Sequence, residues 1–322
     1  MFQHLLVPMD GSVLAECVLP HVMALASAMG ARVTLLHVLE TPHEQGEGQA
    51  IDPVEWHLKK REAHGYLEQI AGQLEGAQMA PEKVILEGVS ADSIIDYTCN
   101  HDVDLVVLSS HGHSGLSGWN ISSVVQKIIL RCCKSVFLVR AFYPTAKDAS
   151  EVRYQRLFVG MDCSARADYV IPFAVRLAQH CKARLTLGTV IECPVMLQRA
   201  PLSEEDLALV NGVAEKNRQW AAHYLEQLQT QFSMEGVDIQ TRLIVSDNAT
   251  DSLHAMVEEE EQADLVLLGA HGQGGIRRYP YGSMATSFIA FGTTSLMIMQ
   301  DLSGEELKQT PAEIAAQQVK GH

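Results

Sequence analysis

The sequence predicts an α/β protein made of two tandem domains, each with an open, twisted, five-stranded parallel sheet. Short apolar runs without alternation, such as Leu105–Leu108, recur along the chain and are typical of parallel strands covered on both faces. Helical patterns with one apolar face separate these runs, and the whole order of patterns occurs twice. A length of 322 residues also favours about two domains.

The first copy is expected to alternate strands and helices with short connections. Leu14, Val18 and Val22 recur at helical spacing and give one apolar face to a helix that Gly30 would end. Loops are predicted where Gly, Glu, Gln or Ser accumulate. In order, we expect strands at 5–7, 33–38, 84–86, 105–108 and 135–139, helices at 13–29, 53–74, 91–99 and 121–132, and loops at 41–51 and 109–118.

The second copy aligns with the first. Asp10 aligns with Asp162, Val38 with Val190 and Gly112 with Gly272, and the extra residues of the second copy lie mainly in 194–205. We therefore expect a first domain over residues 1–142, a second over 153–301, and a C-terminal tail over 302–322 with a short helix. A polar linker over 141–152 joins the two domains.

The composition excludes several classes of partner. With 39 acidic and 24 basic residues the formal net charge is −15, which disfavours binding to nucleic acid and to anionic membrane surfaces. No signal peptide or membrane span is recognised, so we expect a cytoplasmic protein. Seven cysteines without a framework spacing fit a reduced compartment and a role as buried apolar side chains.

The most informative stretch follows the apolar run Leu265–Leu268. It has the spacing Gly269-x2-Gly272-x9-Gly282-Ser283 and leads into a predicted helix at 284–291 and a strand at 295–299. We expect the glycines at 269, 272, 274 and 275 to let the backbone take positive φ and approach a ligand closely. Backbone N–H groups and a helix N-terminus then point at one spot, which suits an anion such as a polyphosphate.

Asp162 is expected to face this loop. Ligands of open α/β sheets bind beyond the carboxyl ends of strands where strand order reverses, and the first and fourth strands end beside that reversal. A carboxylate there accepts hydrogen bonds from an adenine amine or a ribose hydroxyl, while main-chain groups frame the base. His271 either contacts the phosphates or is an ordinary loop histidine. Arg277 and Arg278 either neutralise phosphate charge or are exposed loop residues.

The glycine spacing resembles the nucleotide-binding loop of the universal stress protein family, in its ATP-binding type, and the resemblance covers nearly the whole chain except the tail. It implies that family's HUP/Rossmann-like fold in tandem, and a bound adenine nucleotide (ATP, or AMP or ADP) with Mg²⁺ bridging phosphates. The ligand-lining residues it implies are Gly160, Asp162, Val190, Leu268, Gly269, Gly272, Gly282, Ser283 and Met284. We add His271 to this set. The family commonly has proline where Gly160 stands.

The first copy departs from this spacing because Ser109 and Ser122 replace the first and third glycines. A Cβ at either position would crowd the backbone or a phosphate if the position requires positive φ. We therefore expect a degenerate first site that is weak, empty or altered. Asp10 and Val38 are retained, so nucleotide binding there stays open.

The preferred function is a stress-response regulatory or sensor module that binds an adenine nucleotide and is not a metabolic enzyme. Two alternatives stay open: a slow ATPase or phosphotransfer protein with His271 as base, and a scaffold that binds no nucleotide. Isolated domains of the family pair through their last strand, so the resemblance implies pairing of the two copies through 135–139 and 295–299. A homodimer and an unknown regulatory protein are further expected partners.

Overall fold

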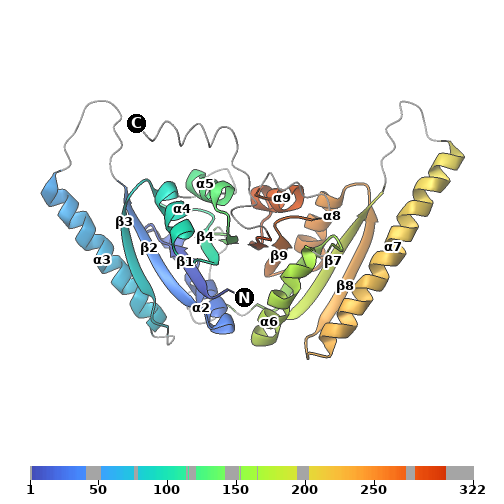
Figure 1. Ribbon diagram of the computed structural model, residues 1–322, viewed down its shortest axis with the longest axis horizontal. Coiled ribbons are helices and arrows are strands. Elements are labelled where there is room, and N and C mark those ends of the chain that lie inside the picture. Colours follow the sequence, from blue (N-terminus) through green and yellow to red (C-terminus); the bar gives the residue numbers. More distant parts are fainter. Residues whose placement is uncertain are drawn as a thin grey trace.

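The computed structural model places the two copies side by side, with the long helices α3 (Pro53–Glu75) and α7 (Glu204–Ser233) at the two outer ends (Figure 1). It describes residues 2–40, 52–75, 79–113, 115, 121–141, 152, 154–164, 166–193, 203–272 and 280–301. The predicted linker, the insertion at 194–205 and the tail at 302–322 fall wholly or largely outside these ranges. Among the described helices, none has the length and apolar character that crossing a bilayer requires.

A single ten-stranded sheet runs through both halves, in the order β3-β2-β1-β4-β5-β10-β9-β6-β7-β8. Within each half all neighbouring strands are parallel, which confirms the predicted fold class. The strands are β1 (His4–Pro8), β2 (Arg32–Glu40), β3 (Glu82–Gly88), β4 (Leu105–Ser109), β5 (Ser135–Val139), β6 (Arg156–Met161), β7 (Arg184–Glu192), β8 (Ile239–Ser246), β9 (Leu265–Gly269) and β10 (Ser295–Met299).

The halves meet through their last strands. β10 pairs antiparallel with β5, and Met297 lies opposite Phe137 in the middle of the pair. This confirms the predicted pairing of residues 135–139 with 295–299. Two serine hydroxyls extend the contact on both sides, because Arg140 N–H donates to Ser295 Oγ at 3.3 Å and Gln300 N–H donates to Ser135 Oγ at 3.0 Å.

The helices of the first half follow the predicted order, with one difference. The expected helix at 13–29 is split into α1 (Val13–Glu16) and α2 (Leu19–Met29). Pro20 lies in the first turn of α2 and has no N–H to continue a helix from α1, so a new helix begins there. α2 ends at Gly30, whose φ of 65° is the left-handed conformation typical of a helix end. The other helices are α4 (Ser90–Asn100) and α5 (Ser123–Arg131).

The second half has the same arrangement. Its helices are the 3-10 turn η1 (Ala167–Val170), α6 (Ile171–Cys181), α7, α8 (Ala249–Ala255), the π-helical turn η2 (Met256–Glu260) and α9 (Ser283–Phe291). Ser203 and Asp206 form a capping box at the start of α7, which explains why that helix begins there.

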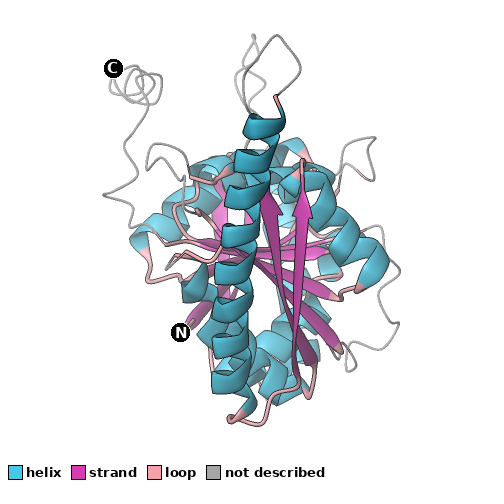
Figure 2. Ribbon diagram, turned by 90° about the vertical axis from the view of Figure 1, so that its right-hand side faces the viewer, coloured by secondary structure: helices cyan, strands magenta, loops and turns pink. Residues whose placement is uncertain are grey.

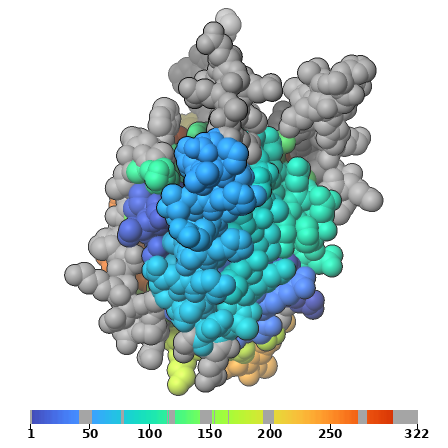
Figure 3. Space-filling model, turned by 90° about the vertical axis from the view of Figure 1, so that its left-hand side faces the viewer, coloured from blue at the N-terminus to red at the C-terminus, as the bar shows by residue number. Residues whose placement is uncertain are grey.

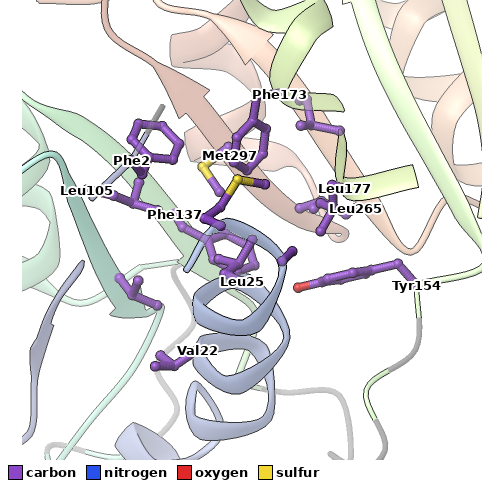
Figure 4. Close-up of a cluster of buried hydrophobic side chains, with 14 of the residues drawn as sticks. Phe2, Val22, Leu25, Leu105, Phe137, Tyr154, Phe173, Leu177, Leu265 and Met297 are labelled. Carbon is purple, nitrogen blue, oxygen red and sulfur yellow. The ribbon is translucent and has the colours of Figure 1, made fainter. Parts of the chain in front are cut away.

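Apolar side chains fill both faces of the sheet. One cluster packs β-strand residues against α2, α3, α6 and α7, and the other packs them against α4, α5, α8 and α9. Figure 2 shows α7 crossing the sheet at one end, and Figure 3 shows the blue residues of α3 running down the opposite end. Each cluster contains residues of both halves, and Figure 4 shows Phe137 and Met297 within the first. The two copies therefore share their cores.

Candidate functional site

The predicted site residues of the second copy gather at one edge of the sheet, where β6, β7 and β9 end. Sheet register places Gly160 beside Leu268 and Met161 beside Thr189, so Asp162 and Val190 follow at the same level. Gly269 ends β9, His271 and Gly272 follow it, and Gly282 to Met284 open α9. At these carboxyl ends, the space between β6 and β9 is the point where strand order reverses within the second half.

Asp162 and Gly272 are in direct contact. A Cβ added to Gly272 would lie 2.1 Å from Asp162 Oδ2, so only glycine lets the loop backbone come this close to the carboxylate. The other oxygen, Oδ1, accepts the N–H of Ser164 at 3.0 Å, which holds the carboxylate in place. The predicted meeting of Asp162 with the glycine loop is present.

Two backbone hydrogen bonds frame the loop. Ala270 N–H donates to Met299 O at 2.8 Å, and Gly282 N–H donates to Ala270 O at 2.7 Å. The second bond brings the start of α9 back to the end of β9. Gly282 is the N-cap of α9 and makes no side-chain cap hydrogen bond, so it does not satisfy the first N–H groups of the helix as a capping side chain would.

The expected positive φ of the loop glycines is wrong for the glycines that the structure describes. Neither Gly269 nor Gly272 has positive φ, and Gly282 has a φ of −74° and a ψ of 173°. Gly272 is required by space and not by backbone conformation. Residues 273–279, which include Gly274, Gly275, Arg277 and Arg278, lie outside the described residues.

The side of the site nearest β7 contains residues that sequence reasoning missed. The Tyr224 hydroxyl of α7 donates to the Asp168 carboxylate, and burial together with this bond raises the pKa of Tyr224. Cys163, directly after Asp162, has a φ of 58°, and its Sγ lies 3.8 Å from Thr189 Oγ1. The alignment of the two copies could have predicted this positive φ, because the residue aligned with Cys163 is Gly11, which has a φ of 82°.

Gly160 leaves room for an apolar side chain. A Cβ at this position would lie 2.5 Å from Leu268 Cδ2 and 3.2 Å from Leu253 Cδ2. Leu268 is 3% exposed and therefore fills the space beside Gly160 rather than projecting from the site. Val190 is partly buried and packs against the same apolar cluster.

The His271 ring is buried and paired. Its side chain is 1% exposed, and Nδ1 lies 2.7 Å from Asp301 Oδ1. Asp301 also lies 3.5 Å from Arg166 Nε, so a basic side chain shares the same carboxylate. The ring is thus held against the end of β10, and its backbone forms part of the loop.

The first copy has the same frame with different side chains. A Cβ at Gly112 would lie 2.0 Å from Asp10 Oδ2, and Ser122 N–H donates to Ser110 O at 2.8 Å. Ser122 caps α5, because its Oγ accepts the N–H of Val125 at 3.3 Å. Its φ of −73° is unstrained, so the crowding expected from positive φ does not occur. The serine hydroxyl instead caps the helix N-terminus, whereas Gly282 at the aligned position makes no side-chain cap hydrogen bond.

Ser109, which replaces the first loop glycine, is also accommodated. Its Oγ makes hydrogen bonds to Leu14 O at 2.8 Å and to His111 O at 2.6 Å. No group of three or more His, Cys, Asp or Glu side chains gathers into a metal-binding cluster among the described residues.

Comparisons with known proteins agree with this architecture. The universal stress protein MJ0577 of Methanocaldococcus jannaschii is 26% identical over 155 residues, which span 44% of this chain and 96% of the relative. A second protein of that organism, universal stress protein MJ0531, is 23% identical over 145 residues and covers 44% of this chain and 83% of its own length. The structure of a universal stress protein from Archaeoglobus fulgidus DSM 4304 matches with a TM-score of 0.63 at 18% identity, covering 92% of this chain and 98% of that one.

A family model also matches both halves of the chain. The model described as the universal stress protein family matches residues 1–140 and matches again over residues 153–299. Because the two matches together span most of the sequence, this chain belongs to the universal stress protein family and carries its domain in tandem.

Proposed function

We propose that the second half binds an adenine nucleotide (ATP, or AMP or ADP) and that the protein acts as a stress-response regulatory or sensor module. One observation supports this above all: the Asp162 carboxylate lies against Gly272 beside a helix N-terminus whose N-cap, Gly282, has no side chain. A carboxylate suits the base or ribose, and an open helix N-terminus suits phosphate. The two features lie together at the carboxyl ends of the parallel strands.

Each residue of the site has a role in this proposal. Asp162 and the main chain around Gly160 and Val190 hold the nucleoside, and Leu268 closes the apolar side. The phosphates lie against the backbone of Gly269, Gly272 and Gly282 and against Ser283 and Met284. His271 contributes its backbone to the loop, since its ring is buried against Asp301. Mg²⁺, which prefers oxygen ligands and retains water, would be bound by phosphate oxygens.

The two domains differ in this function. We infer that the first domain, residues 1–142, has a degenerate nucleotide site and that the second domain, residues 153–301, has an intact one. The support is the Ser122 hydroxyl, which accepts the Val125 N–H that a phosphate would otherwise receive. Asp10 and Gly112 keep the contact seen between Asp162 and Gly272, so the part of the first site that faces a nucleoside is preserved.

Calorimetry tests the proposal directly. Wild-type protein is titrated with ATP, ADP and AMP in the presence of Mg²⁺, beside the variants Asp162→Ala and Asp10→Ala. We expect one strong site per chain that Asp162→Ala removes and Asp10→Ala leaves intact. Absence of binding at millimolar nucleotide, or loss of binding only in Asp10→Ala, would contradict the proposal. Mass spectrometry of the small molecules that co-purify with the protein identifies the natural ligand.

One contact supports a second candidate function, slow ATP hydrolysis. The 2.7 Å contact between His271 Nδ1 and Asp301 is the arrangement that orients a general base. Burial of the ring argues against access to a water molecule at the γ-phosphate. The test is ATP turnover by the wild type and by His271→Ala. If the wild type hydrolyses ATP and the variant does not, while ATP affinity is unchanged, the protein is an ATPase.

A further inference from the structure

Arg140 connects the first half to the helix that opens the phosphate side of the second. It directly follows β5 and is 2% exposed. Its Nη2 donates to Phe288 O at 2.6 Å and to Ile289 O at 3.1 Å, and its Nε donates to Thr294 O at 3.5 Å. Phe288 and Ile289 lie in the last turn of α9, where the carbonyls carry partial negative charge. The Phe288 carbonyl accepts the N–H of Gly292 from the helix itself, and the guanidinium adds a second donor to it. A guanidinium is well matched to such a helix end.

The end of α9 is shaped to receive this side chain. A Cβ at Gly292 would lie 2.7 Å from Phe288 O, so glycine keeps the space around this carbonyl open. Gly292 N–H donates to the same carbonyl at 3.0 Å. The aligned residue of the first copy is Cys132, which has a side chain at that place.

The segment that leads into α9 is held by the same junction. Gln300 Nε2 donates to Pro280 O at 3.1 Å, while Gln300 N–H donates to Ser135 Oγ of the first half. Tyr281 is buried in the apolar cluster that also contains Cys132 of the first half. Both ends of α9 are therefore fixed by the paired strands β5 and β10 or by residues beside them.

The two copies differ in how the last turn of this helix is held. Gln300 aligns with Arg140, is uncharged, and directs its amide to Pro280 of its own half. Of the two aligned positions, only the one in the first half supplies a cation. It acts on the helix whose N-terminus is uncapped, whereas α5 has its own cap in Ser122.

We propose that Arg140 is a positioning residue for phosphate binding in the second half. By holding the last carbonyls of α9, it fixes the direction of the helix so that the N–H groups of Ser283, Met284 and Ala285 converge on one anion. Its charge also acts along the short helix, through a core that screens charge less than water does. The first half thereby acts as the platform for the site of the second. This inference rests on the proposed nucleotide binding.

The test compares ATP with adenosine, which lacks the phosphates. Calorimetry is run on the wild type, on Arg140→Gln, which places the residue of the aligned position there, and on Arg140→Lys, which keeps the charge and loses the planar fork. We expect Arg140→Gln to weaken ATP binding about tenfold, equivalent to ~1.4 kcal/mol, with adenosine affinity unchanged. Arg140→Lys is expected to fall between the wild type and Arg140→Gln.

Tyr154→Phe is the matched control. It removes another buried hydrogen bond across the junction, the 2.7 Å contact between the Tyr154 hydroxyl and His21 Nδ1, on the sheet face opposite α9. This variant should lower the melting temperature and keep wild-type affinity for ATP. Wild-type ATP affinity in Arg140→Gln, or equal losses for ATP and adenosine, would overturn the positioning role alone. If Arg140→Gln does not fold, Arg140→Lys decides between the same outcomes. Absence of ATP binding by the wild type would overturn the proposed function as well.

Discussion

Gly282→Ser would give α9 the cap that Ser122 gives α5. The backbone at Gly282 has a φ of −74° and a ψ of 173°, close to the −73° and 159° at Ser122, so serine fits without strain. A Cβ there would lie 3.5 Å from Ala270 O and 3.8 Å from His271 Cα, which is ordinary contact. The new hydroxyl would accept the N–H of Ala285, as Ser122 Oγ accepts that of Val125.

The change therefore separates stability from binding. Serine is a better N-cap than glycine by a few tenths of a kcal/mol, so the free energy of unfolding is expected to rise slightly. The phosphate loses one N–H donor, and a hydrogen bond to a charged group contributes about 1.5–3 kcal/mol. ATP affinity is thus expected to fall about 10- to 150-fold.

Calorimetry with ATP and thermal denaturation of the unliganded protein measure the two effects. Gly282→Ala adds the Cβ without the hydroxyl and should retain most of the ATP affinity. Ser122→Gly should destabilise the protein slightly and leave the ATP affinity of the second half unchanged. If Gly282→Ser binds ATP like the wild type, or if Gly282→Ala loses as much affinity as Gly282→Ser, competition for the helix N–H groups is refuted.

Three further perturbations test other parts of the structure. Gly272→Ala should weaken ATP binding about tenfold or more in calorimetry, because its Cβ would lie 2.1 Å from Asp162 Oδ2 and displace the carboxylate. Burial lowers the pKa of His21 from 6.5 to about 4, so the unfolded chain binds a proton that the folded chain excludes. Stability is then full above pH 6.5 and should fall by roughly 3 kcal/mol toward pH 4 in urea denaturation. Gly188→Ala should cost about 1–3 kcal/mol of unfolding free energy in the same assay, because its Cβ would lie 2.0 Å from Phe158 Cζ.

Controls make these outcomes specific. His21→Gln should flatten the acid limb of the stability profile, and an unchanged limb would refute the assignment to this side chain. Phe158→Leu should recover part of the cost of Gly188→Ala, because the first copy has Leu6 and Leu36 at the aligned positions. Full ATP affinity in Gly272→Ala would show that Asp162 does not need its observed place.

The sheet and the place where the candidate site residues meet could be predicted because both follow from patterns that repeat. Runs such as Leu105–Leu108 identify parallel strands, and the alternation of strands and helices defines where strand order reverses. Asp162 and Gly272 lie far apart in sequence, yet strand topology alone places both at that reversal. Their contact follows from the fold class and needs no knowledge of side-chain packing.

The details that were missed depend on local geometry. Pro20 divides the expected helix at 13–29, and the apolar periodicity continued through the break and hid it. A glycine in a sequence does not reveal whether it provides positive φ or space, and Gly272 provides space. Cys163 adopts a left-handed conformation that its residue type does not suggest.

Arg140 was beyond sequence reasoning for a different reason. Its partner Phe288 lies 148 residues further along the chain and in the other copy. A basic side chain after an apolar strand is usually exposed to solvent. Here the antiparallel pairing of β5 with β10 places Arg140 against the end of a helix in the other half. Such a contact depends on how two domains dock, which periodicity and spacing do not encode.

The predicted domain limits, homodimer and regulatory partner stay predictions.

The joining of β5 and β10 has a consequence for assembly. Two separate copies would meet at a rate and to an extent that dilution controls, whereas here both strands belong to one polypeptide and find each other at a high effective concentration. The melting temperature of this junction should therefore be the same in dilute and concentrated samples. A covalent tether also lets the two copies diverge, since each always meets the same counterpart and neither has to remain self-complementary.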